Sequence, residues 1–142
     1  MTPESSETSK VATEQLMLEA ILDGGSWGEY LSALPPERGL RTLAIATSAA
    51  VFRKWPEDPS LETIVDYVSE IDRRYTGELP VARVEIESVI RGIFGEPGLI
   101  DGTSSKVVVG AQLLIIRSIG FDVLSSATER NAYLAEVLEA VD

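Results

Sequence analysis

Three carboxylates at four-residue spacing are the side chains in this sequence best placed to do chemistry together. Glu62, Asp66 and Glu70 would lie on one helix face, because residues four apart stack along a helix surface. Hard cations such as Mg²⁺ prefer oxygen ligands, so this stripe could bind one if Glu136 and Glu139 on the last predicted helix added carboxylates. Stacked acids on the polar face of an amphipathic helix more often face water, and we therefore assign no metal, cofactor or catalytic residue.

The chain lacks the residue types on which many catalytic and metal sites depend. Its 142 residues include no histidine and no cysteine. Without imidazole there is no ready general base near neutral pH and no Ser-His-Asp arrangement. Without thiolates there is no disulfide, thiolate nucleophile or zinc–sulfur site. The enzyme that remains open is one that uses carboxylates, tyrosine or arginine, together with Mg²⁺.

Net charge and motifs restrict the classes of partner. The formal net charge is −11, so DNA and anionic membranes would be repelled, and a basic partner would be attracted. The Walker A, Gly-x-Gly-x-x-Gly and Gly-x-Ser-x-Gly patterns are missing. We therefore expect no nucleic-acid, nucleotide or membrane partner. The same charge also serves solubility alone, without any partner.

Two large aromatic side chains lie close together in a short predicted helix. Trp27 and Tyr30 are three residues apart, and aromatic residues of this size dominate the energetics of many interfaces. This pair predicts an anchor for a partner protein. The alternative is that both side chains close one end of the helical bundle.

An apolar stretch near residues 104–119 is the element that the other helices must enclose. Val107 to Ile116 carries no charge, and so apolar a segment is normally buried on all sides. Its three consecutive valines favour a strand. A helix is favoured by Ser104 as an N-terminal cap, by Gly120 as a C-terminal stop, and by Arg117 in the last turn. We predict a helix.

Amphipathic patterns bounded by glycine and proline predict further helices along the chain. Their approximate ranges are 10–23, 26–34, 36–54, 58–75, 80–94 and 126–142. Residues 26–29 and 126–129, Ser-x-x-Glu in both cases, are typical of capping boxes. The inward bulk of the helices at 36–54 and 58–75 is predicted to come from Leu40, Leu43, Ile45, Val51, Phe52, Leu61, Ile64, Val65, Val68, Ile71 and Tyr75.

These patterns predict an all-α fold. We expect a compact single-domain bundle of about five longer helices and one or two short ones, wrapped around the apolar helix near 104–119. Residues 1–9 are polar and predict a disordered tail, which leaves residues 10–142 as the helical domain. Because the first residues lack the basic and apolar pattern of a secretion signal, a cytoplasmic location is expected.

The first functional hypothesis is a non-enzymatic, acidic protein-interaction or regulatory module. It would bind another protein, with a basic partner favoured by charge, or itself. The candidate partner-binding residues are Trp27, Tyr30, Glu62, Asp66 and Glu70. The first alternative is a bundle that binds a small apolar ligand between the central helix and the alanine-rich helix at 36–54. The second alternative is the carboxylate- and Mg²⁺-dependent enzyme.

Overall fold

The computed structural model describes residues 12–142, and the predicted tail at residues 1–9 lies outside the described residues. In this part of the chain there is no strand, which confirms the all-α prediction. The elements are α2 (Thr13–Asp23), α3 (Gly28–Ala33), α4 (Pro36–Lys54), α5 (Leu61–Arg74), α6 (Arg83–Ile93), the 3-10 helix η1 (Pro97–Ile100), α7 (Ser105–Val123) and α8 (Ala127–Val141). Within residues 12–142, no helix is long and apolar enough to cross a membrane.

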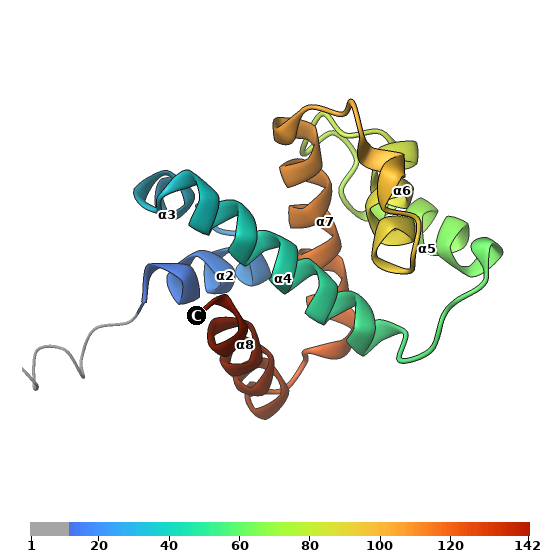
Figure 1. Ribbon diagram of the computed structural model, residues 1–142. Coiled ribbons are helices and arrows are strands. Elements are labelled where there is room, and N and C mark those ends of the chain that lie inside the picture. The colour runs from blue at the N-terminus through green and yellow to red at the C-terminus, as the bar shows by residue number, and fades with distance from the viewer. Residues whose placement is uncertain (1–11) are drawn as a thin grey trace, which may run out of the picture.

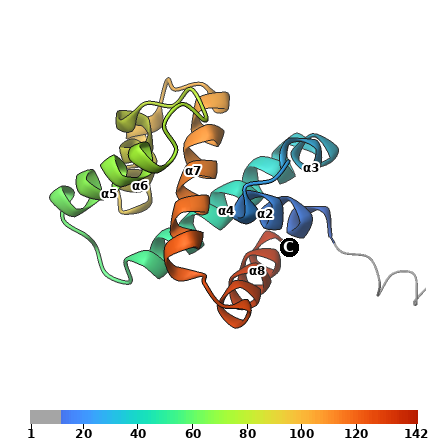
Figure 2. The same cartoon turned by 180° about the vertical axis from the view of Figure 1, so that it is seen from behind.

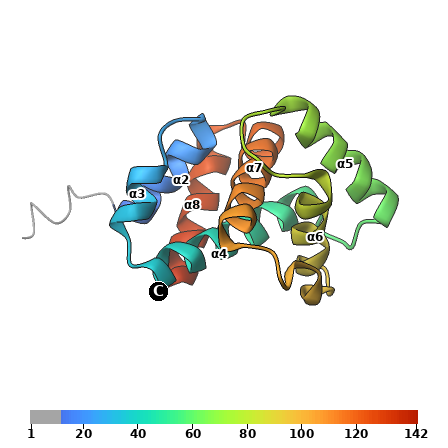
Figure 3. The same cartoon turned by 90° about the horizontal axis from the view of Figure 1, so that it is seen from above.

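Helix α7 is the central element of the bundle. In Figures 1 and 2 it runs between two groups of helices, with α5 and α6 on one side and α2 and α8 on the other. Helix α4 crosses α7 and continues toward both groups. Seen from above in Figure 3, α7 again lies between α2 and α6. The prediction of an apolar helix enclosed by amphipathic ones is therefore confirmed.

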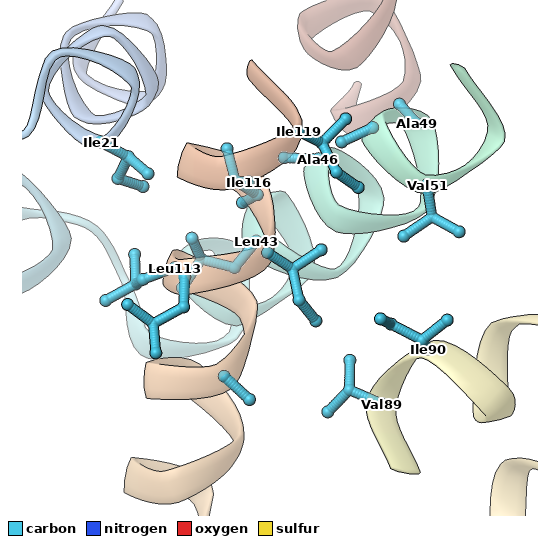
Figure 4. Packing of buried hydrophobic residues seen from close by; sticks show 14 of the residues in the cluster. Ile21, Leu43, Ala46, Ala49, Val51, Val89, Ile90, Leu113, Ile116 and Ile119 are labelled. Atoms are coloured by element: carbon cyan, nitrogen blue, oxygen red, sulfur yellow. The ribbon is translucent and has the colours of Figure 1, made fainter. Parts of the chain in front are cut away.

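The core is centred where α4 and α7 meet. Leu43 and Ala46 of α4 lie beside Ile116 and Ile119 of α7, and all four side chains are fully buried. Alanines at positions 46, 49 and 50 carry no bulky branch at these points of α4, so that the two helices approach closely. Figure 4 shows that α2 and α6 add side chains from opposite sides of this contact. One contiguous apolar cluster thus joins all the long helices.

The start of α7 agrees with the prediction, but its end does not. The Ser104 hydroxyl accepts a hydrogen bond of 3.3 Å from the backbone N–H of Val107, as expected for an N-terminal cap. Gly120 does not stop the helix, which continues to Val123. Gly120 is buried, and a Cβ at this position would collide with the side chain of Leu22. The glycine therefore supplies space for α2 rather than a left-handed terminus.

The two Ser-x-x-Glu segments behave differently. At the start of α8, the hydroxyl of Ser126 accepts a hydrogen bond of 3.1 Å from the Glu129 N–H, so this predicted cap is confirmed. At the start of α3, the predicted cap by Ser26 is wrong, because Trp27 is the N-terminal cap residue and no side chain bonds the free N–H groups. Trp27 itself has helical angles (φ −90°, ψ −22°) and packs against the core. The first turn of α3 therefore begins one residue later than predicted.

Helices α5 and α6 both begin later than predicted. The cap of α5 is Ser60, whose hydroxyl accepts a hydrogen bond of 3.1 Å from the Thr63 N–H, so the helix begins at Leu61 and not at residue 58. Helix α6 begins at Arg83 rather than at Pro80. The reason is a tight turn around Pro80, in which the N–H of residue 81 donates to the carbonyl of residue 79 at 2.9 Å. This turn keeps residues 79–81 out of the helix, and the same residues form one wall of a cleft beside α7.

Several apolar side chains predicted to point inward are exposed. Leu40, Phe52, Leu61 and Val65 are 44, 47, 54 and 40% exposed, so their predicted burial is wrong. For Leu61 and Val65, the cause is the position of α5 at the outer edge of the molecule (Figures 1 and 3). The apolar face of α5 is wider than the surface that α6 and α7 cover. Only Ile64, Tyr67, Val68 and Ile71 are buried along this helix.

Candidate functional site

An apolar cleft of about 540 Å³ lies between α3, the α5–α6 loop and the first half of α7. We call it the α3–α7 cleft. Its walls are almost wholly apolar, and the polar groups of its lining side chains are those of Ser105 and Lys106 and the Trp27 indole N–H. The complete lining consists of Trp27, Leu31, Leu79, Pro80, Val81, Ser105, Lys106, Val107, Val109, Gly110 and Leu113. A concave, apolar site with few polar groups is the usual form of a small-molecule site.

Helix α7 forms one wall of the cleft, and a glycine in this wall lets the opposite side come close. A Cβ added to Gly110 would lie 2.7 Å from Cγ2 of Val81 and 3.8 Å from Cδ1 of Leu79. Even alanine at position 110 would therefore force Val81 to move. The close approach of residues 79–81 to α7 therefore depends on the missing side chain of Gly110.

The opposite wall, residues 79–81, is fixed at both ends. On one side, Glu78 forms an ion pair of 2.7 Å with Arg117 of α7. On the other side, the Glu85 side chain accepts a hydrogen bond of 2.7 Å from the backbone N–H of Ala82. The loop wall is thus tied to α7 at one end and to the start of α6 at the other.

The third wall comes from the segment around α3. Gly24, directly after α2, has the left-handed conformation (φ 75°), and the chain turns so that Trp27 reaches the cleft. Leu31, one turn along α3, completes the wall. Both side chains are half-buried and pack against the core. The two side chains of the predicted aromatic pair therefore have different surroundings. Trp27 lines the cleft, whereas Tyr30 packs on the core without lining it.

The seam between α4 and α7, where an apolar pocket was predicted, holds a smaller hollow. It measures about 170 Å³ and lies between Ala44 of α4 and Val108 of α7, next to α6. Close packing of the two helices explains the difference, since small side chains on α4 let α7 fill the space. The larger apolar space is on the other side of α7. A hollow therefore exists at the predicted location, but it is smaller than the α3–α7 cleft.

A second group of functional side chains joins α5 to α7. We call Tyr67, Arg74, Ser118 and Asp122 the Tyr67–Asp122 cluster. The Tyr67 phenol donates a hydrogen bond of 2.7 Å to Oδ2 of Asp122. Arg74 donates hydrogen bonds of 2.9 and 3.1 Å to the two carboxylate oxygens of Asp122. Because the single phenol proton is used there, the Ser118 hydroxyl donates to Tyr67 at 2.8 Å while it accepts from Arg74 at 2.7 Å.

The electrostatics of the Tyr67–Asp122 cluster hold each proton in place. Burial and the hydrogen bond to Asp122 raise the pKa of Tyr67 well above its ordinary value. Burial alone would raise the pKa of Asp122, but hydrogen bonds from Arg74 and Tyr67 outweigh it and the pKa is lowered. The pKa of Arg74 is raised, chiefly by its hydrogen bond to Asp122. General acid–base catalysis needs a group whose pKa lies near the working pH. The pKa values in this cluster are all shifted away from neutral pH, so the cluster is suited to joining the two helices.

The predicted carboxylate stripe lies on α5 beside this cluster but does not gather into a site. Glu62 and Asp66 are exposed, whereas Glu70 is paired with Arg73 and Arg74. Glu136 of α8, one of the two acids that could have added to the stripe, lies instead 2.8 Å from Arg53 of α4. Within residues 12–142, no group of three or more acidic side chains is arranged to hold a metal ion.

Some lining residues of the α3–α7 cleft were missed in the sequence. Leu79 and Val81 flank Pro80, at the start of the helix predicted over 80–94. Lys106 is the only charge between Ser104 and Gln112, directly before the apolar stretch. Both features are visible in the sequence. Their proximity follows only from the fold.

Comparison with known proteins gives no relative from which a function could be inferred. The chain matches no protein-family model, no curated protein and no solved structure. Function must be argued from the geometry of the molecule alone.

Proposed function

We propose that this protein binds a small apolar ligand in the α3–α7 cleft. The observation that carries the proposal is a cleft of about 540 Å³ bounded by mainly apolar walls. Small-molecule sites are typically concave spaces of about 300 to 1,000 Å³ with few polar groups. The sequence offered this as the alternative to a protein-interaction module. The geometry favours it because the cleft walls are held by the core, by the Glu78–Arg117 pair and by the cap on Ala82.

The expected affinity follows from the apolar surface of the ligand that the cleft would remove from water. A single ten-carbon chain gains about 0.8 kcal/mol for each fully buried methylene group. Because the cleft is partly open and binding costs translational and rotational freedom, the Kd should be no tighter than about 1 µM. Such a protein would carry, store or sense an apolar compound rather than transform it.

The two tryptophans allow a direct test. Trp27 lines the cleft, whereas Trp55 packs edge-on against Tyr67 with ring centroids 5.4 Å apart, away from the cleft lining. The Trp55→Phe variant leaves Trp27 as the only tryptophan, and Trp27→Phe leaves Trp55. We would titrate both variants with decanol, below its solubility limit, and follow tryptophan fluorescence.

The proposal predicts a saturable fluorescence change in Trp55→Phe. The matched variant Trp27→Phe should show no saturable change, because its remaining tryptophan lies outside the cleft. A second pair of variants controls for nonspecific partitioning. Val109→Trp should fill the cleft and remove calorimetrically measured decanol binding, while Val84→Trp, at a site 65% exposed on α6, should leave it intact. Equal decanol binding by Val109→Trp and Val84→Trp would refute the proposal.

A second candidate function is binding of a basic amphipathic helix from another protein. The observation that favours it is the outer face of α5, where Leu61 and Val65 are 54 and 40% exposed beside Glu62 and Asp66. Exposed apolar and acidic side chains at this spacing complement a helix with lysines around an apolar stripe. A synthetic leucine- and lysine-containing helix should bind in low salt, and Val65→Ser should weaken the complex. Unchanged binding by Val65→Ser would exclude this face.

A further inference from the structure

Lys106 differs from nearly all the other cationic side chains of this acidic protein. Of the lysines and arginines among residues 12–142, only Arg41 and Lys106 have no described carboxylate within 4.0 Å. The net charge of −11 makes carboxylates abundant, so an unpaired lysine is unusual here. Lys106 is exposed and lines the α3–α7 cleft, whereas Arg41 is exposed on α4 and does not line it.

The polar groups of the cleft are concentrated at one end. Ser105 and Lys106 form the first turn of α7, and the other lining side chains are apolar apart from the Trp27 indole N–H. No acidic residue is part of the lining. The closest acid along the loop wall, Glu78, is neutralised by its 2.7 Å pair with Arg117. The cleft is therefore apolar along its length and cationic at the end where α7 begins, where the helix dipole adds a charge of the same sign.

We infer that the ligand of the α3–α7 cleft is an anionic amphiphile, an alkyl chain whose compact carboxylate lies at Lys106. This inference rests on the proposed apolar-ligand function and adds the chemistry of the headgroup. The alkyl chain would lie between Trp27, Val81 and Gly110, and the carboxylate would take the ion pair that the protein itself does not supply. A cationic amphiphile would be repelled at this end, and a neutral one would gain nothing from the lysine.

The acidic net charge does not prevent this binding. At physiological ionic strength, interactions between exposed charges are screened beyond about 8 Å. An anion at the cleft mouth therefore responds mainly to its immediate neighbours, among which the lining offers a lysine and no carboxylate. Away from the mouth, the surrounding negative charge would discourage the same anion from binding elsewhere on the surface.

The experiment compares decanoate with decanol, which share the chain and differ in the charge of the head. We would measure Kd by calorimetry at neutral pH and below micelle formation, for the parent protein and three variants. Lys106→Gln removes the charge and Lys106→Arg keeps it. Arg41→Gln is the matched control, because it removes the other unpaired cation without touching the cleft. An exposed ion pair contributes about a two- to fivefold change in Kd.

The inference predicts that Lys106→Gln weakens decanoate binding about two- to fivefold and leaves decanol binding unchanged. Lys106→Arg and Arg41→Gln should both retain the decanoate affinity of the parent protein. If decanol binds in the cleft but Lys106→Gln leaves decanoate affinity unchanged, or weakens it no more than Arg41→Gln does, the headgroup inference is overturned and the apolar-ligand function stands. If neither compound binds the parent protein, both are overturned.

Discussion

The phenol of Tyr67 donates a hydrogen bond of 2.7 Å to the carboxylate of Asp122, which lies 55 residues later in the chain. This bond joins α5, at the edge of the molecule, to the end of the central helix α7. Arg74 adds an ion pair to the same carboxylate at 2.9 Å. The side chain of Asp122 is 19% exposed, so these contacts are largely withdrawn from water. They fix α5 where its apolar contact with α7 is limited.

The Asp122→Asn variant should lose about 2 kcal/mol of unfolding free energy at neutral pH. The reason is that hydrogen bonds to a charged partner contribute more than neutral ones, and asparagine leaves the Arg74 charge without its counterion. The measurement is chemical denaturation at pH 7. Asp72→Asn is the control, because its ion pair with Arg83 is more exposed and should contribute less than 1 kcal/mol. Equal losses in both variants would contradict this prediction.

The same cluster predicts how stability depends on acid. The pKa of Asp122 in the folded protein is lowered from an ordinary value of 3.8 by the contacts of Arg74 and Tyr67, which outweigh burial. A carboxylate with a lowered pKa stabilises the fold above its ordinary pKa, and this contribution is lost as the pH falls through the folded value. The stability difference between the parent protein and Asp122→Asn should therefore shrink below about pH 4. Denaturation measured from pH 6 downward checks this.

The buried hydroxyl of Tyr133 should make the folding stability depend on pH in alkaline solution. Its ring is fully buried, its hydroxyl donates to the Ala46 carbonyl at 2.7 Å, and burial raises its pKa above the ordinary 10.0. A group that must stay protonated in the fold contributes stability below its unfolded pKa and loses it as the pH rises. Tyr133→Phe should cost about 1 kcal/mol at pH 7, for the lost hydrogen bond. Above about pH 10, the stability of the Tyr133→Phe variant should fall less steeply than that of the parent protein.

Alkaline denaturation of the parent protein and Tyr133→Phe, followed by far-ultraviolet circular dichroism, tests this. Tyr67 contributes a decline of the same sign in both proteins, since its pKa is also raised. The comparison therefore isolates Tyr133. Parallel stability curves above pH 10 would mean that the Tyr133 hydroxyl ionises as easily in the fold as in the unfolded chain.

Truncation on the central helix tests whether α7 is the enclosed element. Ile116 is fully buried, and Ile116→Ala should cost about 2 to 5 kcal/mol because it leaves a cavity in a packed core. Leu61 is 54% exposed on α5, and Leu61→Ala should change stability by less than about 1 kcal/mol. Thermal and urea unfolding of the two variants give the comparison. A small loss at position 116 would contradict the placement of α7 in the core.

The two Ser-x-x-Glu segments offer a matched test of capping. Ser126 caps α8 through the Glu129 N–H, so Ser126→Ala should destabilise the protein by about 1 kcal/mol. Ser26 makes no capping bond, so Ser26→Ala should have no measurable effect. Urea midpoints of the two variants, measured side by side, are sufficient. A loss at position 26 as large as that at position 126 would show that Ser26 caps α3 after all.

The sequence predicted the fold class because the pattern of apolar and polar residues is local. Prolines at both ends bounded α4 correctly at Pro36 and Lys54, and the uncharged run of α7 revealed which helix is enclosed. Gly120 was misread because a buried glycine and a helix-ending glycine look alike in sequence. The distinction depends on Leu22 of α2, which reaches Gly120 only in the folded chain.

The cleft could not be predicted for the same reason. Its walls come from residues 27–31, 79–81 and 105–113, and no local pattern states that these segments meet. The carboxylate stripe was visible in sequence because it lies on one helix. Whether other helices add to it is a matter of tertiary arrangement, and Glu136 pairs with Arg53 instead.

The most direct test of the account is to locate a bound apolar chain by nuclear magnetic resonance. Intermolecular nuclear Overhauser effects would be recorded between decanol and the methyl groups of the full-length protein. The account predicts contacts with Leu31, Val81 and Val109, which line the α3–α7 cleft, and none with Leu61 or Val65 on the outer face of α5. Contacts confined to Leu61 and Val65, or none with the cleft methyl groups near the solubility limit of decanol, would contradict it.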